Sequence, residues 1–187
     1  MAGVLVRKIV SGGQTGADRA GIDFAIAYGI EYGGWVPKGG KAEDLTTPPG
    51  LLALYPLLEE APTTSMAART KFNIRDSDAT LIIRPHGGVM SPGTKLTIEL
   101  CEQLKKPYAV IDPNDWDGAD QFAEFLHFVD KSWRDNHAWL DGESESTPMD
   151  PIVLNVAGPR ESKSKGIYDA AMGFLVESVG VVQYASA

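Results

Sequence analysis

The sequence predicts an α/β protein with a Rossmann-like, doubly wound and mainly parallel sheet that carries helices on both faces. Short apolar runs alternate along the chain with longer segments whose apolar residues recur at helical spacing. Strands that are apolar throughout are typical of parallel sheets, which are buried on both faces and joined by right-handed crossovers. A chain of 187 residues, 43% of them apolar, is expected to form a single domain over residues 1–187.

The strands are predicted from apolar runs that end at glycine, proline or polar residues. The run VLVRKIV at 4–10 ends near a Gly-Gly pair, and the run ATLIIR at 79–84 ends at a loop rich in glycine and proline. On the same grounds we expect strands at residues 4–10, 31–36, 79–84, 107–112 and 152–156.

The helices are predicted from helical apolar spacing and from their end signals. Gly29 closes the helix over 17–29, and Ser65 is the expected N-cap of the helix over 65–76. Further helices are expected at 94–105, 118–131 and 166–179. Residues 38–64 contain four prolines and should form loops with a little helix. The polar, acidic stretch 134–150 shows no periodicity and is expected to be a mobile connection.

Composition argues against several classes of function. Lys and Arg number 17 and Asp and Glu number 25, and the net charge of −8 disfavours nucleic acids and anionic membranes as partners. The single cysteine, Cys101, fits a reducing cytosol, and its apolar neighbours favour a place in the core. No apolar run approaches the roughly 20 residues of a membrane span, so we expect a soluble, cytoplasmic protein. We predict no metal site, because His86, His127 and His137 are scattered and the calcium-like stretch 113–124 begins with proline.

Three polar loops are expected to meet at one edge of the sheet. They span Gly12–Asp18, Pro85–Thr97 and Asn155–Lys165, each after a predicted strand. Ligands of doubly wound sheets bind beyond the carboxyl ends of the strands, and glycine-rich helix starts suit anions. Arg69 and Asn73 share one helix face, and a guanidinium is well shaped for phosphate. The convergence predicts a small-molecule site, although a tight turn or a capped helix would explain each loop separately.

The glycine motifs do not match those of common nucleotide sites. The loop GGQTGAD at 12–18 has GGxxG spacing instead of GxGxxG, and no P-loop lysine follows it. Gly88 and Gly93 have GxxxxG spacing, but Thr94-Lys95 reverses the required order of lysine and threonine. A conventional dinucleotide or nucleoside-triphosphate site is therefore not predicted.

Five longer segments are specific enough to indicate a family. They are KIVSGGQTGADRAGIDFAI (8–26), GGWVPKGGKAED (33–44), RTKFNIRDSDATLII (69–83), GTKLTIELCEQLKKP (93–107) and LNVAGPRESKSKGIYD (154–169). They resemble the putative molybdenum carrier family, whose better-known members are molybdenum cofactor carrier proteins. The resemblance lapses at 45–64 and 113–150. It implies a Rossmann-like homo-oligomer, a dimer or tetramer, that binds, protects and transfers molybdenum cofactor (molybdopterin), or molybdate, without catalysis. Molybdoenzymes or cofactor biosynthesis proteins would be the donors and acceptors.

The resemblance also implies which residues hold the ligand. The cofactor is a pterin dithiolene with a terminal phosphate and an oxo-metal head, so it is anionic at both ends and needs many hydrogen-bond donors. No residue would be catalytic. The neutral ligand-binding groups would come from Gly12, Gly13, Gln14, Thr15, Asn73, Gly93, Thr94, Thr97, Gly158 and Ser162. Positive charge would come from Lys38, Arg69 and Arg160.

A wider resemblance keeps an enzyme as the alternative. Residues 66–99 are similar to the lysine-decarboxylase-like phosphoribohydrolases, which release a base from a nucleoside monophosphate and carry PGGxGTxxE after a strand. Arg69 fits their upstream arginine, but their acid falls at Thr97 here. Glu99 lies two positions further on, which turns its side chain about 200° around the helix. A nucleoside-5′-monophosphate phosphoribohydrolase and a nucleotide-binding sensor without turnover therefore remain alternatives.

Overall fold

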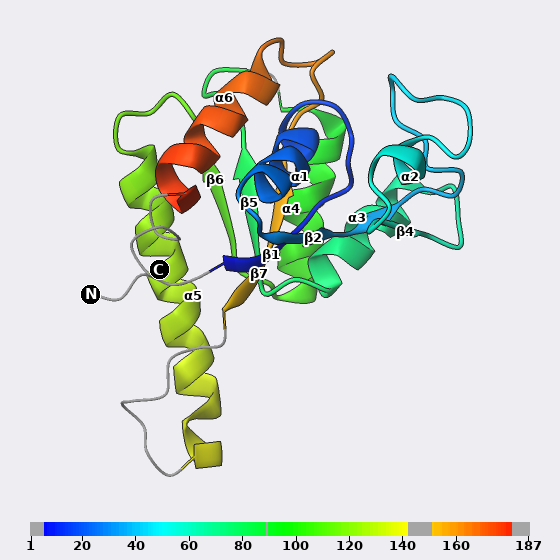
Figure 1. Cartoon of the computed structure of the whole chain (residues 1–187). Coiled ribbons are helices and arrows are strands. Elements are labelled where there is room, and N and C mark those ends of the chain that lie inside the picture. The colour runs from blue at the N-terminus through cyan, green and yellow to red at the C-terminus, as the bar shows by residue number, and fades with distance from the viewer. Residues whose placement is uncertain (1–5, 89, 142–150, 181–187) are drawn as a thin grey trace.

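A five-stranded parallel sheet forms the centre of the protein in a computed structural model that describes residues 6–88, 90–141 and 151–180 (Figure 1). Each pairing in this sheet is parallel, in the order β2-β1-β7-β5-β6. The strands are β1 (Val6–Val10), β2 (Glu31–Gly33), β5 (Ala79–Ile83), β6 (Tyr108–Ile111) and β7 (Ile152–Ala157). This arrangement confirms the predicted Rossmann-like α/β fold.

The last strand of the chain occupies the middle of the sheet. Leu154 of β7 pairs with Ile9 of β1 on one side and with Ala79 of β5 on the other. If β7 preceded β1 along the chain, the order would be 3-2-1-4-5, which is the order of a Rossmann sheet. The sheet is thus a circular permutation of that order, and its strand order reverses between β7 and β5. Ligands of such sheets bind where the order reverses.

Helices cover both faces of the sheet. The helices α1 (Ala17–Ala27), α5 (Gly118–Asp141) and α6 (Ile167–Leu175) pack on one face, and α6 continues into a π-helical turn (Val176–Gly180). The helices α3 (Met66–Arg75) and α4 (Pro92–Leu104) cover the other face (Figure 1). Alternate strand residues supply the larger core, in which Leu81 and Leu154 are fully buried with Phe24 of α1. Cys101 is fully buried beside Ile74 on the second face, as expected for a core residue.

A segment with its own two-stranded sheet lies along the chain between β2 and β5. The predicted strand at 31–36 is divided into β2 and β3 (Trp35–Val36), and β3 pairs with β4 (Glu59–Glu60) after the short helix α2 (Leu51–Leu54). The break falls at Gly34, whose φ is 129° and where an added Cβ would overlap the backbone oxygen of Ser11. The prediction of one continuous strand was wrong because this close approach to the end of β1 requires glycine.

Most predicted helices are present, but α5 is longer than expected. Ser65 caps α3 by accepting the N–H of Ala68 at 3.2 Å, which confirms that helix start. The prediction of a mobile connection from residue 134 was wrong over 134–141, where α5 continues, while 142–150 lie outside the described residues. The sequence has neither glycine nor proline between Gly118 and Gly142, and Asp130 pairs with Arg134 one turn away at 2.9 Å. In the described part of the chain, each helix is too short or too polar to cross a membrane.

Candidate functional site

The carboxyl edge of the sheet holds a cavity of about 270 Å³ next to the point where the strand order reverses. Its walls include residues of all three loops that the sequence predicted would meet, together with one face of α3. The β1–α1 loop supplies Gly12 and Gln14, the start of α4 supplies Gly93, and the β7–α6 loop supplies Gly158 and Arg160. The predicted convergence of these loops is confirmed.

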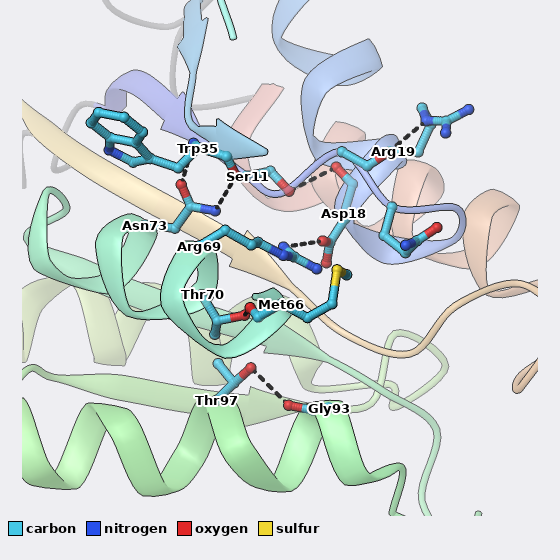
Figure 2. A network of polar contacts seen from close by, with 12 residues as sticks. Ser11, Asp18, Arg19, Trp35, Met66, Arg69, Thr70, Asn73, Gly93 and Thr97 are labelled. Carbon is cyan, nitrogen blue, oxygen red and sulfur yellow. Dashed lines mark hydrogen bonds and ion pairs between the residues drawn. The ribbon is translucent and has the colours of Figure 1, made fainter. Parts of the chain in front are cut away.

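A buried ion pair spans the base of this cavity. Arg69 reaches across from α3, and its Nη1 lies 3.1 Å from Oδ2 of Asp18 in the first turn of α1 (Figure 2). The exposed fractions of the two side chains are 12% and 7%. An added Cβ at Gly12 would overlap the guanidinium, so the absence of a side chain there lets Arg69 lie against the loop backbone. Burial raises the pKa of Asp18, while Arg69 and backbone N–H groups oppose that rise.

The cavity has an excess of positive charge. Arg160 and Lys163 line it, and within the described residues neither side chain has a hydrogen-bond or ion-pair partner. The charge of Arg69 is balanced by Asp18, but the Nε of Arg69 is buried and has no hydrogen-bond partner in the described structure. The lining of the cavity therefore has two more cationic than anionic side chains, although the whole chain has a net charge of −8.

The start of α4 closes another side of the cavity. Ser91 accepts the N–H of Thr94 at 3.1 Å, and Pro92 occupies the first turn. The partial positive charge of a helix N-terminus therefore faces a cavity that already contains cations. The hydroxyl of Thr97 donates to the carbonyl oxygen of Gly93 at 3.0 Å (Figure 2).

The position of the hydrolase acid is occupied by a neutral side chain. Thr97 lines the cavity, whereas Glu99 does not belong to its lining. The Glu99 side chain is 48% exposed and lies 3.7 Å from Lys95 one helical turn away. This placement agrees with the predicted rotation of Glu99 around the helix.

Asn73 lies in the cavity wall, but β3 uses both ends of its amide. The backbone N–H of Trp35 donates to Oδ1 at 2.6 Å, and Nδ2 donates to the carbonyl oxygen of Trp35 at 3.1 Å (Figure 2). Asn73 is 2% exposed. Its amide thus joins α3 to β3, which leaves one N–H of Nδ2 and one lone pair of Oδ1 for the ligand contact expected from the sequence.

A second carboxylate of the chain holds two of the predicted donors. Glu43 accepts the hydroxyl of Ser162 at 2.6 Å, the backbone N–H of Ser162 at 3.3 Å and the hydroxyl of Thr15. The backbone N–H of Glu43 in turn donates to Oε1 of Gln14 at 2.8 Å. Burial acts to raise the pKa of Glu43, but the bonds from Ser162 and Thr15 outweigh it and lower the pKa.

The structure therefore separates the thirteen predicted residues into two groups. The residues that line the cavity are Gly12, Gln14, Arg69, Asn73, Gly93, Thr97, Gly158 and Arg160. Those outside the lining are Gly13, Thr15, Lys38, Thr94 and Ser162. Lys38 is exposed, and its backbone N–H donates to the carbonyl oxygen of Thr63, which follows β4.

Two other features were not among the predicted ligand-binding residues. The sequence places Asn155 at the start of the polar loop 155–165, but it lies within β7, where it is buried in the cavity wall and donates to Thr80 at 3.2 Å. Beyond β5 and β6, His86, Asp112 and Asp115 bring three ligand-type atoms within 4.8 Å of one another. Sequence spacing does not join these residues, and none of them lines the cavity.

The comparisons with known proteins agree with the sheet order. Residues 9–179 match the circularly permutated YpsA SLOG family. A crystal structure of a putative molybdenum carrier protein from Syntrophus aciditrophicus SB is similar to this chain, with 39% sequence identity and a TM-score of 0.75. The match covers 95% of this chain and 96% of that one. No curated protein sequence gives a significant match.

Proposed function

Because this chain belongs to the circularly permuted YpsA SLOG family and is 39% identical to a putative molybdenum carrier protein, we propose that it is a carrier of molybdenum cofactor. The protein binds the cofactor at the carboxyl edge of the sheet, shields it and releases it unchanged. The cofactor, a pterin with a phosphate at one end and an oxo-metal group at the other, is the cargo and not a resident catalyst. Molybdate, which shares the tetrahedral oxyanion chemistry of phosphate, is a smaller ligand for the same donors.

The observation that carries this proposal is the charge of the cavity. The side chains of Arg160 and Lys163 line the cavity and form no hydrogen bond or ion pair within the described residues, although the charge of Arg160 also acts on Glu43. The start of α4 adds a helix dipole of the same sign. Cations of this kind bind phosphate and oxo groups through charge-assisted hydrogen bonds, each of which contributes about 1.5–3 kcal/mol. Gln14 and Asn155 add amide groups that suit a polar ring system.

The cavity lacks a free acid for base hydrolysis. Among its described lining residues the acidic one is Asp18, which is paired with Arg69. Thr97 cannot take or give a proton as a carboxyl group does, and Glu99 lies outside the lining. Binding without turnover is therefore favoured over the phosphoribohydrolase alternative. Transfer to or from molybdoenzymes or cofactor biosynthesis proteins, and assembly as a homo-oligomer, remain part of the proposal through the family resemblance.

Anaerobic retention of cofactor tests this function. Purified protein is incubated with molybdenum cofactor and, in parallel, with AMP, then desalted and assayed for molybdenum, pterin and free adenine. We expect stoichiometric pterin and molybdenum without adenine release. Arg160→Ala should reduce retention by about tenfold or more, which corresponds to the loss of at least 1.4 kcal/mol of binding free energy.

Lys165→Ala is the matched control for charge. Lys165 is exposed on the same loop as Arg160 but does not line the cavity, so its removal should leave retention unchanged. Equal losses in both variants would mean that retention reflects general charge and would count against the cavity as the site. Adenine release without cofactor retention would overturn the carrier and support the hydrolase.

A further inference from the structure

Several hydrogen-bond donors from two separate loops converge on the carboxylate of Glu43. The hydroxyl of Thr15 comes from the β1–α1 loop, and both the hydroxyl and the backbone N–H of Ser162 come from the β7–α6 loop. The positive charge of Arg160 acts on the same carboxylate. Glu43 itself comes from a third segment, between β3 and α2. The contact therefore joins three parts of the chain at the edge of the cavity.

This donor set is the kind that binds a free oxyanion. Two hydroxyl groups, a backbone N–H and a nearby guanidinium offer charge-assisted hydrogen bonds to any small anion placed between them. A carboxylate of the chain now accepts these bonds, with its oxygens in the place that two oxygens of a phosphate or molybdate would take. The neutral donors also match the residues expected from the sequence to bind oxo groups.

We propose that Thr15, Ser162 and Arg160 form a second oxyanion subsite, which Glu43 fills in the ligand-free protein and which one anionic end of the ligand takes over by displacing the Glu43 carboxylate. The ligand class is a small molecule with an oxyanion, either a phosphate or an oxo-molybdenum group, at the end that enters this subsite. The inference rests on the proposed function, because it adds a second point of attachment to the ligand of the cavity. Arg160 belongs to both sites, since it lines the cavity and acts on Glu43.

The exchange requires rotation of one side chain and no movement of the loop. The backbone N–H of Glu43 is held by Gln14 at 2.8 Å, and Asp44 forms two bonds of 3.0 Å with Arg19. Ala42 is 6% exposed and packs in the small core beneath this segment. These contacts fix the backbone on both sides of Glu43, while its side chain is only partly buried and can turn toward solvent.

Glu43→Gln distinguishes a carboxylate that occupies an anion subsite from one that only holds the loops together. A glutamine has the same shape and can still accept hydrogen bonds, but it does not repel an incoming anion. We expect Glu43→Gln to bind inorganic phosphate or molybdate about tenfold more tightly than the wild type in calorimetric titrations at fixed ionic strength. The oxyanion with the larger gain identifies which end of the ligand enters the subsite. Glu59→Gln, an exposed site on β4, makes the same change in net charge and should show no gain.

The gain should depend on the other donors of the subsite. Adding Ser162→Ala to Glu43→Gln should abolish most of it, because both residues belong to one network. In the wild type, the backbone N–H resonance of Ser162 should shift when the protein is saturated with molybdate or phosphate. This measurement does not depend on whether a variant folds. Unchanged or weaker anion binding in Glu43→Gln, together with a static Ser162 resonance, would mean that Glu43 braces the loops and would overturn the subsite.

The two proposals can fail separately. If the wild type retains cofactor through Arg160 but Glu43→Gln gains no affinity for either oxyanion, the subsite is refuted and the carrier stands. If no variant retains cofactor while Glu43→Gln gains oxyanion affinity through Ser162, the subsite stands and the identity of the carried ligand is refuted.

Discussion

Removal of the Arg69 guanidinium should destabilise the protein strongly, because it leaves the buried carboxylate of Asp18 without its cation. The two groups are 3.1 Å apart, and the Asp18 side chain is 7% exposed. Breaking a buried ion pair from one side costs about 3–5 kcal/mol. Backbone N–H groups of Gln14 and Gly158 still donate to Asp18. We therefore expect Arg69→Met, which keeps the apolar stem, to lower the free energy of unfolding by about 3 kcal/mol at neutral pH.

The loss should depend on pH in a direction set by Asp18. Burial raises the pKa of this carboxyl in the folded protein above its ordinary value of 3.8, although Arg69 acts to lower it. A carboxyl whose folded pKa is raised contributes stability that is fully present below the unfolded pKa and is lost as pH rises through the folded pKa. Arg69→Met removes the lowering influence, so the folded pKa rises further and the penalty at neutral pH grows. The destabilisation should therefore shrink as pH falls toward about 4.

Urea unfolding at pH 5 and at pH 7.5 measures both effects. With a slope of about 2 kcal/mol/M, a loss of 3 kcal/mol moves the midpoint by about 1.5 M. Arg75→Met on the same helix is the control, because its partner Asp76 is 38% exposed and its loss should hardly move the midpoint. Adding Asp18→Asn to Arg69→Met should restore part of the stability and remove the pH dependence. Equal midpoints for the two methionine variants, or a loss independent of pH, would refute this account of Asp18.

Three further variants, with Gly173→Ala as a control, test other contacts of the site and of the helices that support it. Gly12→Ala places a methyl group on the buried guanidinium of Arg69 and should lower both the melting temperature and ligand retention. Gly173→Ala, in an exposed and open position on α6, should instead stabilise the protein by up to about 1 kcal/mol. Asn73→Ala removes two hydrogen bonds to the backbone of β3 and should lower the unfolding free energy by about 2 kcal/mol in urea; an unchanged midpoint would contradict that role. Burial, followed by the bond to Asp23, raises the pKa of Tyr168 to about 12, so its contribution to stability is complete below about pH 10 and is lost through pH 12. Tyr168→Phe should remove one late phase from the absorbance titration at high pH.

The edge at which the loops meet could be predicted, because carboxyl ends of parallel strands share one side of a sheet. The order of the strands could not be predicted from hydrophobic pattern, since an apolar run such as 152–156 does not specify its neighbours. The break at Gly34 depends on the approach of Ser11 from another strand, which local sequence does not reveal. The length of α5 is compatible with the sequence, because no glycine or proline interrupts 119–141, and a polar composition does not by itself end a helix.

The site was predicted as a set of donors, but the partners of those donors within the chain were not predicted. Arg69 was expected to face a ligand, yet its closest charged partner is Asp18, 51 residues away in the sequence. Thr15 and Ser162 were expected to offer hydroxyl groups, and the carboxylate that holds them belongs to Glu43. Spacing indicates which residues can share a face, but it carries no information about which distant side chain will approach them.

The proposed function gives the carboxylates of Asp18 and Glu43 a physical reason, because a protein that carries an anion must also be stable without it. Cations gathered at one edge repel one another when that edge is empty, and a buried guanidinium without a partner is costly. Asp18 stabilises the buried charge of Arg69, and this pair is expected to persist when a ligand binds because both side chains are buried. Glu43 is less buried, and hydroxyl and N–H donors hold it, so the proposed exchange with a ligand costs less there than at Asp18. When the Glu43 carboxylate occupies the proposed subsite, a ligand cannot, so the apparent affinity for the ligand falls in proportion to the fraction of protein with an open subsite. This lower affinity favours release. Reversible binding is what transfer of an intact ligand requires, so the same carboxylate that stabilises the empty site would also limit how tightly the cargo is held.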